Sequence, residues 1–247
     1  MRKATFVIVL SVGVLIAAFG AHAQQPAPAP AAPRAAAAPA PKPVPLFLRE
    51  TFQGTAVAPA VPLTNAQLLN PNLEVKLYGP GATAKPDHPS GLGLYNEMDP
   101  VTGMDVSYIW SGLTDANWIF TLRDKNNDVD LSGLGRIHWR ARTRGFNTIR
   151  PVIKLEDGTM LVGDFGQGES TYWHENEFFV GDVPRWRVFD EKDIVATKEG
   201  EWRTKVDLSK VSEIGVTDLS RGSGGGRGGN SGLDWIEVYG NPVKRGS

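Results

Sequence analysis

Apolar and polar residues alternate along several stretches of this chain, most clearly over residues 136–144. There Ile137 and Trp139 stand two positions apart, and the positions between the apolar residues are arginines and a histidine. Because successive side chains of a strand point to opposite faces, this pattern predicts a β-strand with one buried face and one basic, solvated face. The same alternation recurs over residues 149–156 and 201–208.

Short runs of β-forming residues, separated by glycine, proline, asparagine and aspartate, continue through the chain. Long helical periodicity is absent, and a short helix is expected only at residues 63–69. About ten strands with regularly spaced turns are typical of a two-sheet sandwich. The predicted fold is all-β, a jelly-roll β-sandwich of two antiparallel sheets, with strands expected at 48–54, 73–79, 104–110, 117–123, 136–144, 148–157, 160–165, 170–180, 201–209, 212–219 and 233–240.

The first residues resemble a secretory signal peptide. Arg2 and Lys3 precede an apolar run at 4–20, and Ala21 and Ala23 form a small-residue cleavage pattern. A signal peptide over residues 1–23 predicts an exported protein that is periplasmic, at the cell surface or extracellular, with no transmembrane segment after cleavage. The alternative is an uncleaved membrane anchor, because the run is near the lower length limit for a span.

Residues 24–45 alternate proline and alanine, which favours an extended, semi-rigid spacer without a core of its own. The remaining residues, 46–245, suit one all-β domain. The chain has no cysteine, so the stability of this domain must come from its core and not from disulfides. With 26 basic and 27 acidic residues, the charge balance excludes nucleic-acid binding through bulk positive charge.

The order of segments from Val129 to Tyr239 resembles the galactose-binding-domain-like β-sandwich found in carbohydrate-binding modules. The resemblance rests on "VDLSGLGRIHWRARTRG", "LEDGT", "EWRTKVDLS", "SEIGVTDL" and "LDWIEVYG". It implies a noncatalytic domain whose partner is a polysaccharide or another glycan. It also implies a structural calcium, for which Glu50 and Asp234 stand at the matching positions. Because the fold also serves other roles, the resemblance does not by itself determine function.

The basic strand face is the first candidate binding surface. Arg140 and Arg142 would lie near Lys154 across a hairpin, and such a face suits the carboxylates or sulfates of an acidic polysaccharide. The alternative is a solvated surface whose cations pair with neighbouring glutamates, and the near-neutral total charge favours it. The glutamates concerned are Glu156, Glu175, Glu177 and Glu201.

Aromatic side chains are the second candidate, because sugar rings stack on them through their apolar C–H faces. Tyr172, Trp173 and Trp186 are expected to be exposed and to bind ligand, whereas Trp139, Trp202 and Trp235 fit buried strand positions. Arg227 lies in a glycine-rich loop that would either reach a ligand or simply span a gap.

Two further hypotheses concern metal and catalysis. Asp124, Asn126, Asp128 and Asp130 alternate as calcium ligands do, although the EF-hand pattern is broken and a polar turn explains the segment better. Catalysis by a small glycoside hydrolase or polysaccharide lyase would centre on His174, Glu175 and Glu177. On a strand, the two glutamates would point one way and the histidine the other.

A third functional class, after carbohydrate binding and catalysis, is an envelope or assembly protein that binds a protein partner. A contiguous apolar patch on the surface would indicate it.

Overall fold

A computed structural model describes residues 43–52, 61–83, 92–112, 117–145, 147–189, 200–219 and 230–245. The chain divides into two units, residues 1–40 and 41–247, and all described residues belong to the second. The predicted signal peptide, nearly all of the spacer and Arg227 lie outside the described residues, so these expectations remain predictions. Within the described ranges, no helix is long and apolar enough to cross a bilayer.

Two antiparallel sheets make up the described part of the second unit. Sheet A has seven strands: β1 (Leu46–Glu50), β2 (Val61–Pro62), β4 (Gly93–Met98), β5 (Asp105–Trp110), β8 (Arg136–Arg144), β11 (His174–Phe179) and β15 (Asn230–Tyr239). Sheet B has nine: β3 (Leu73–Tyr78), β6 (Trp118–Asp124), β7 (Asn127–Asp130), β9 (Arg150–Leu155), β10 (Met160–Gly163), β12 (Trp186–Val188), β13 (Trp202–Arg203), β14 (Val211–Asp218) and β16 (Asn241–Lys244).

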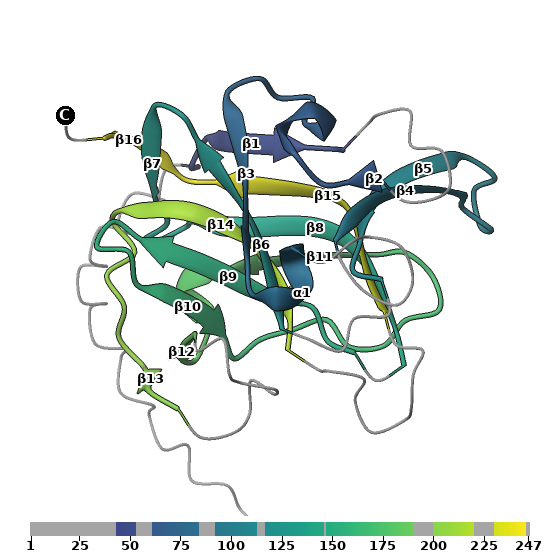
Figure 1. Cartoon of the computed structure of the whole chain (residues 1–247). Helices are drawn as coiled ribbons and strands as arrows, with labels where there is room; N and C mark the ends of the chain where they lie inside the picture. The colour runs from purple at the N-terminus through teal and green to yellow at the C-terminus, as the bar shows by residue number, and fades with distance from the viewer. Residues whose placement is uncertain are drawn as a thin grey trace, which may run out of the picture. The chain divides into compact units, whose positions relative to one another are not determined.

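The strand order confirms the predicted β-sandwich. Sheet A runs β11-β8-β15-β5-β4-β2, with β1 also pairing β15, and sheet B runs β13-β12-β10-β9-β14-β6-β3. Figure 1 shows β9, β14, β6 and β3 in front of β8, β11 and β15. The remaining described elements are short helical turns: η1 (Asn65–Gln67), α1 (Pro80–Thr83) and η2 (Val180–Asp182).

The core lies between the facing sides of the two sheets, as the alternation predicts. Ile137, Trp139 and Ala141 of β8 are fully buried in one hydrophobic cluster with residues of β6, β9 and β14. The Trp139 ring packs edge-on against Phe178, and its indole N–H donates to Gln167 at 3.0 Å. The outer face of sheet A, the side that points away from sheet B, therefore carries the alternate residues of β8.

Two local signals in the sequence are also confirmed, and a third is not. The expected helix at residues 63–69 is the 3-10 turn η1, which begins after a Thr64 capping box that Gln67 completes. The segment "EDGT" at residues 156–159 predicts a hairpin turn, and the turn at Gly158, where φ is 86°, joins β9 to β10. The missing N–H of Pro151 predicts an edge strand or a bulge. Pro151 lies instead in β9 between β10 and β14, paired with Val216 of β14 and just beyond the last residue that β10 pairs.

Candidate functional site

Sheet A forks along one edge of β15, and the fork opens a cleft. Gly232 and Leu233 pair with β5, whereas Ile236 and Glu237 pair with β1, so the neighbour changes within a few residues. Asp234 lies at a register shift in the pairing with β8. A β-bulge of this kind bends a strand and re-aims its side chains. The neighbouring strands separate there and leave a hollow of about 690 Å³.

Polar side chains and one aromatic ring line this cleft. Trp235 is partly exposed and meets the His138 ring edge-on at 4.6 Å, which places it on the outer face. The walls come from β1 and β5 and the floor from β8 and β15: Arg49, Thr51, Met104, Asp105, Val106, Ser107, Arg140, Asp234 and Trp235. Because most of these residues belong to paired strands or directly flank them, the site is held on a rigid frame.

Arg140 is held by two carboxylates at the floor of the cleft. Its guanidinium donates to Asp234 of β15 and, at 2.6 Å, to Asp99 in the β4–β5 turn. The pKa of Asp99 is lowered, chiefly by a hydrogen bond from the Val101 N–H and also by Arg140. Burial raises the pKa of Asp234, although Arg140 opposes the shift. Arg140 thus ties the β4–β5 hairpin to β15 and keeps the cleft wall in place.

The sequence predicts that Arg142 lies on a solvated strand face, and this prediction is wrong. Only 5% of Arg142 is exposed. Its guanidinium pairs with Glu97 and lies over the rings of Tyr108 and Trp173. Trp173, predicted to be exposed, is itself only 9% exposed in a small cluster with Val106 and Tyr108. The outer face of sheet A therefore carries its own aromatic layer, which covers this arginine.

The predicted continuous basic face does not form. Arg140 belongs to sheet A, but Lys154 belongs to β9 in sheet B, because the chain crosses between the sheets after residue 144. Lys154 pairs there with Glu213 at 3.3 Å. On sheet A, Arg136 pairs with Glu177 at 3.1 Å. The pair between Arg136 and Glu177 matches the alternative of cations paired with carboxylates, whereas Lys154 pairs with Glu213, a buried glutamate that the alternative did not name.

Of the remaining predictions about aromatic side chains, some are confirmed and others are wrong. Tyr172 is 50% exposed, as expected, whereas Trp186 is 3% exposed and packs in the core. Trp235, assigned to the core from sequence, is the indole that lines the cleft. Its outward direction could have been read from "WIEVY", where Trp235 shares a strand face with polar Glu237 while Ile236 lies on the opposite, buried face.

The candidate catalytic residues lie away from the cleft. Glu175 and Glu177 share the outer face of the edge strand β11 and pair in register with Arg140 and His138 of β8. The Glu175 carboxylate is 3.5 Å from His138. His174 alternates to the other face, as predicted. None of His174, Glu175 and Glu177 lines the cleft, and the geometry assembles no acid–base pair around it.

The candidate calcium ligands already have protein partners. The Glu50 carboxylate accepts four backbone hydrogen bonds, and Asp234 binds Arg140. The Asp124 carboxylate accepts from the N–H groups of Asn126 and Asn127, and these bonds form the polar turn that the sequence offered as the alternative to a calcium site. Asp128 pairs with Arg245 at 2.8 Å, and Asp130 accepts from the Ser132 N–H. Among the described residues, no three acidic or histidine side chains gather as a metal site.

Comparisons with known proteins give structural neighbours only. No protein-family model and no curated protein matches the sequence. The structure is similar to a family 11 carbohydrate-binding module of a Clostridium thermocellum cellulase, at 11% identity and TM-score 0.41, covering 83% of this chain and 98% of that one. It is also similar to the carbohydrate-binding module TmCBM61, at 10% identity and TM-score 0.35, covering 68% and 88%.

A third neighbour is an exo-β-agarase, at 8% identity and TM-score 0.40, covering 71% of this chain and 24% of that one. These neighbours include modules of the kind that the sequence resembles. At such identities and TM-scores, the similarity does not indicate what this chain binds.

Proposed function

We propose that the domain binds carbohydrate noncovalently in the cleft between β1 and β5. The observation that carries the proposal is the position of Trp235, a partly exposed indole in a cleft of about 690 Å³ whose other walls are mostly polar. A partly exposed indole in a cleft offers the apolar C–H face of a sugar a surface on which to stack.

The chemistry of the lining fits a polyhydroxylated ligand. A sugar presents hydroxyls that both donate and accept, together with an apolar C–H face. Thr51 and Ser107 supply hydroxyls, Asp105 and Asp234 supply acceptors, and Trp235 supplies the apolar surface. A cleft with one aromatic platform and a few fixed polar groups is a common arrangement in small-ligand sites.

The charges of the cleft favour a neutral glycan over the acidic polysaccharide expected from sequence. Arg140 is shared by Asp99 and Asp234, and Arg49 pairs with Glu237 at 3.3 Å. A uronate or sulfate would have to compete with these carboxylates and would lie beside their negative charge. Neutral hydroxyls can instead accept from the arginines and donate to the carboxylates without breaking either pair.

Substitution of Trp235 by alanine tests the proposal. The assay is retention in native gels that contain a soluble neutral β-glucan, a neutral galactan or an acidic pectate, followed by calorimetric titration of any glycan that retards the protein. Loss of one stacking platform should weaken binding of the neutral ligand by about tenfold or more, equivalent to about 1.4 kcal/mol. Trp202→Ala, in β13 of the other sheet, is the matched control and should bind normally.

Three outcomes would count against this function. Equal weakening by Trp202→Ala would show a general folding defect, and unchanged binding by Trp235→Ala would place the ligand elsewhere. Retention on pectate alone would restore the acidic-polysaccharide class. Repeating the titration with a chelator tests the predicted calcium separately, because only a calcium-dependent domain would lose affinity.

A protein-binding role has one specific observation in its favour. The turn of the β4–β5 hairpin carries three exposed apolar side chains, Met98, Val101 and Met104. If every glycan fails to bind, this apolar tip becomes the better candidate surface. Replacing Met98 and Met104 together by serine should then abolish co-purification with a defined protein partner while leaving the thermal midpoint unchanged.

A further inference from the structure

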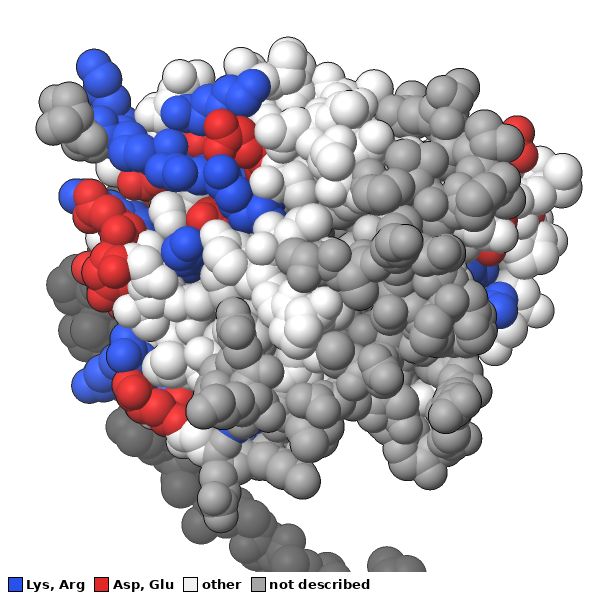
Figure 2. Space-filling model, viewed as in Figure 1, with Lys and Arg blue, Asp and Glu red and all other residues white. Residues whose placement is uncertain are grey.

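A second hollow lies on the outer face of sheet B, on the opposite side of the sandwich from the cleft. It measures about 390 Å³, within the range of small-molecule sites. Figure 2 shows that basic and acidic side chains gather on one part of this face, in the region where Figure 1 places β7, β14 and β16. The lining residues are Arg123, Asp128, Lys154, Leu155, Glu156, Gly158, Ser212, Glu213 and Arg245.

Five of the six charged side chains in this lining pair with another charge. Lys154 binds Glu213 at 3.3 Å, and the Tyr78 hydroxyl bridges the same two groups. Asp128 is bound by Arg245 at 2.8 Å. Glu156, at the rim, is bound by Lys210 at 3.0 Å. The opposite charges within these pairs cancel. The net charge of the hollow therefore comes from the sixth side chain.

Arg123 is that side chain, and it has no ion-pair partner in the part of the chain that the structure describes. Its Nε atom is buried and meets no hydrogen-bond acceptor. Glu74 of β3 stands opposite Arg123 in register, but its carboxylate is bound by Lys76 at 2.9 Å. Arg123 therefore contributes to the lining of the hollow a cation without an ion pair, and its buried Nε–H is costly without an acceptor.

We propose that this hollow is an anion site in which Arg123 binds a single carboxylate or sulfate group of a small acid or an acidic sugar. The planar guanidinium fork matches such an oxyanion through two parallel hydrogen bonds. The site is independent of the neutral-glycan cleft, since the two share no lining residue.

Titration of the full chain, followed by its amide and arginine Nε–H resonances, tests this site. The probes are sodium glucuronate, glucose as its uncharged counterpart, and sodium sulfate. Glucuronate should shift the Arg123 Nε–H and the amides of Leu155 and Ser212 in a saturable way, and glucose should not. If sulfate shifts the same signals, the site binds oxyanions in general. If glucuronate alone shifts them, the site is specific for a carboxylate.

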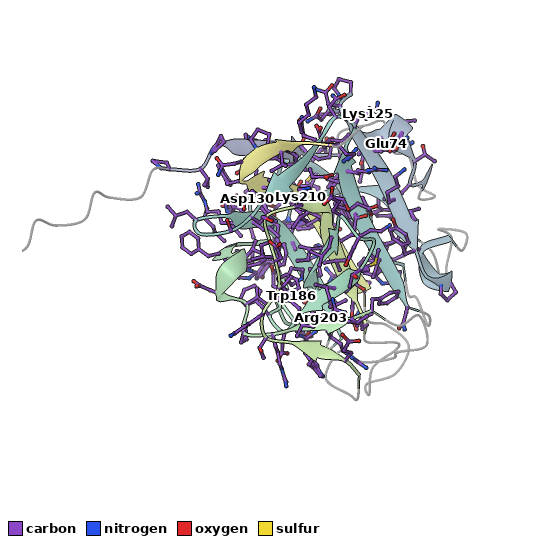
Figure 3. All side chains as sticks on the ribbon, turned by 90° about the vertical axis from the view of Figure 1, so that its left-hand side faces the viewer. Glu74, Lys125, Asp130, Trp186, Arg203 and Lys210 are labelled. Atoms are coloured by element: carbon purple, nitrogen blue, oxygen red, sulfur yellow. The ribbon has the colours of Figure 1, made fainter. Side chains whose placement is uncertain are left out.

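Three variants distinguish a requirement for the guanidinium group from a requirement for positive charge alone. Arg123→Gln should weaken glucuronate binding by about tenfold or more, and Arg123→Lys should recover only part of it because the fork is lost. Lys125→Gln is the matched control, since Lys125 is a neighbouring cation that does not line the hollow, and it should bind normally. Figure 3 shows Lys125 beside Glu74, at the opposite end of this view from Trp186 and Arg203.

The proposal is overturned if neither anion shifts these resonances, if glucose shifts them equally, or if Lys125→Gln weakens binding as much as Arg123→Gln. Folding of each variant is checked in the same spectra from amides of sheet A, which should keep their positions. Binding of neutral glycan to the cleft should be unaffected by Arg123→Gln, so failure of either proposal can be told from failure of the other.

Discussion

The Glu50 side chain is a buried carboxylate whose oxygens are used entirely by the backbone. One oxygen accepts from the N–H groups of Thr51, Phe52 and Leu69, and the other accepts from Asn70, at 3.0 to 3.1 Å. Phe52, next to it, has φ of 45°, a left-handed conformation that a bulky residue adopts only under constraint. Glu50 supplies that constraint and also fixes the loop before β3.

Glu50→Gln tests this role. An amide keeps the size of the side chain but replaces one acceptor oxygen with a donor, which would face N–H groups that already donate. The free energy of unfolding should fall by about 2 kcal/mol or more in urea titrations. Glu74→Gln is the control, and because its ion pair is on the surface its effect should stay below about 1 kcal/mol. An equal effect of the two substitutions would contradict the role assigned to Glu50.

The β4–β5 hairpin forms one wall of the cleft, and Arg140 anchors it through Asp99. Only 2% of Asp99 is exposed, and its two oxygens serve different partners, the Val101 N–H within the turn and the guanidinium of Arg140. The pKa of Asp99 lies below its ordinary value. A carboxyl with a lowered folded pKa stabilises the protein above its unfolded pKa, and that contribution is lost as the pH falls through the folded value.

Asp99→Asn should therefore destabilise the domain in a pH-dependent way. The amide oxygen can still accept from Val101, so the turn is kept while the charge opposite Arg140 is lost. Unfolding free energy should drop by about 2 kcal/mol at neutral pH, and the difference from the unsubstituted protein should shrink as the pH falls below about 4. Thermal melts across this range make the measurement. Asp105→Asn, at an exposed position in β5, is the control, and its difference in stability from the unsubstituted protein should not change with pH in this way. If the difference for Asp99→Asn stays constant across the pH range, the argument is refuted.

Strands with clean alternation were predictable as elements, but their assignment to sheets was not. β8 and β9 both show an apolar and a charged face in sequence. In the structure the burial of β8 alternates over residues 136–141, whereas in β9 Val152, on the same face as Arg150 and Lys154, is also buried. Sequence placed the charged faces together across a hairpin. Instead, β8 and β9 lie in different sheets, so Arg140 and Lys154 have unrelated surroundings. Alternation reports which side chains share a face of one strand and contains no information about the neighbouring strand.

The sandwich as a whole is held by apolar contact between the inner faces of its sheets. Trp139 is central, since it is fully buried, packs against Phe178 and donates its indole N–H to Gln167. Phe52, after β1 of sheet A, meets Phe120 of sheet B edge-on at 5.6 Å. A chain without cysteine depends on such contacts because no disulfide limits its unfolded state.

Trp139→Phe measures this dependence. The smaller ring leaves a cavity and removes one donor from Gln167, so the unfolding free energy should fall by about 2 kcal/mol. Trp202→Phe, at a half-buried position in β13, should cost less than about 1 kcal/mol. Urea midpoints compared at one pH test the prediction, and similar losses for both variants would show that the two tryptophans contribute alike.

Residue order alone was sufficient for the β class, the buried face of β8, the turn at Gly158 and the short η1 helix, because these depend on neighbours within a few positions. The cleft depends on the bulge at Asp234 and on the exchange of β5 for β1 along β15. The burial of Arg142 and Trp173 depends on an aromatic layer assembled from separate segments. Both are products of long-range strand pairing, which local periodicity does not specify. Periodicity gives the strand face on which Trp235 lies, but only the paired sheets place that face in a cleft.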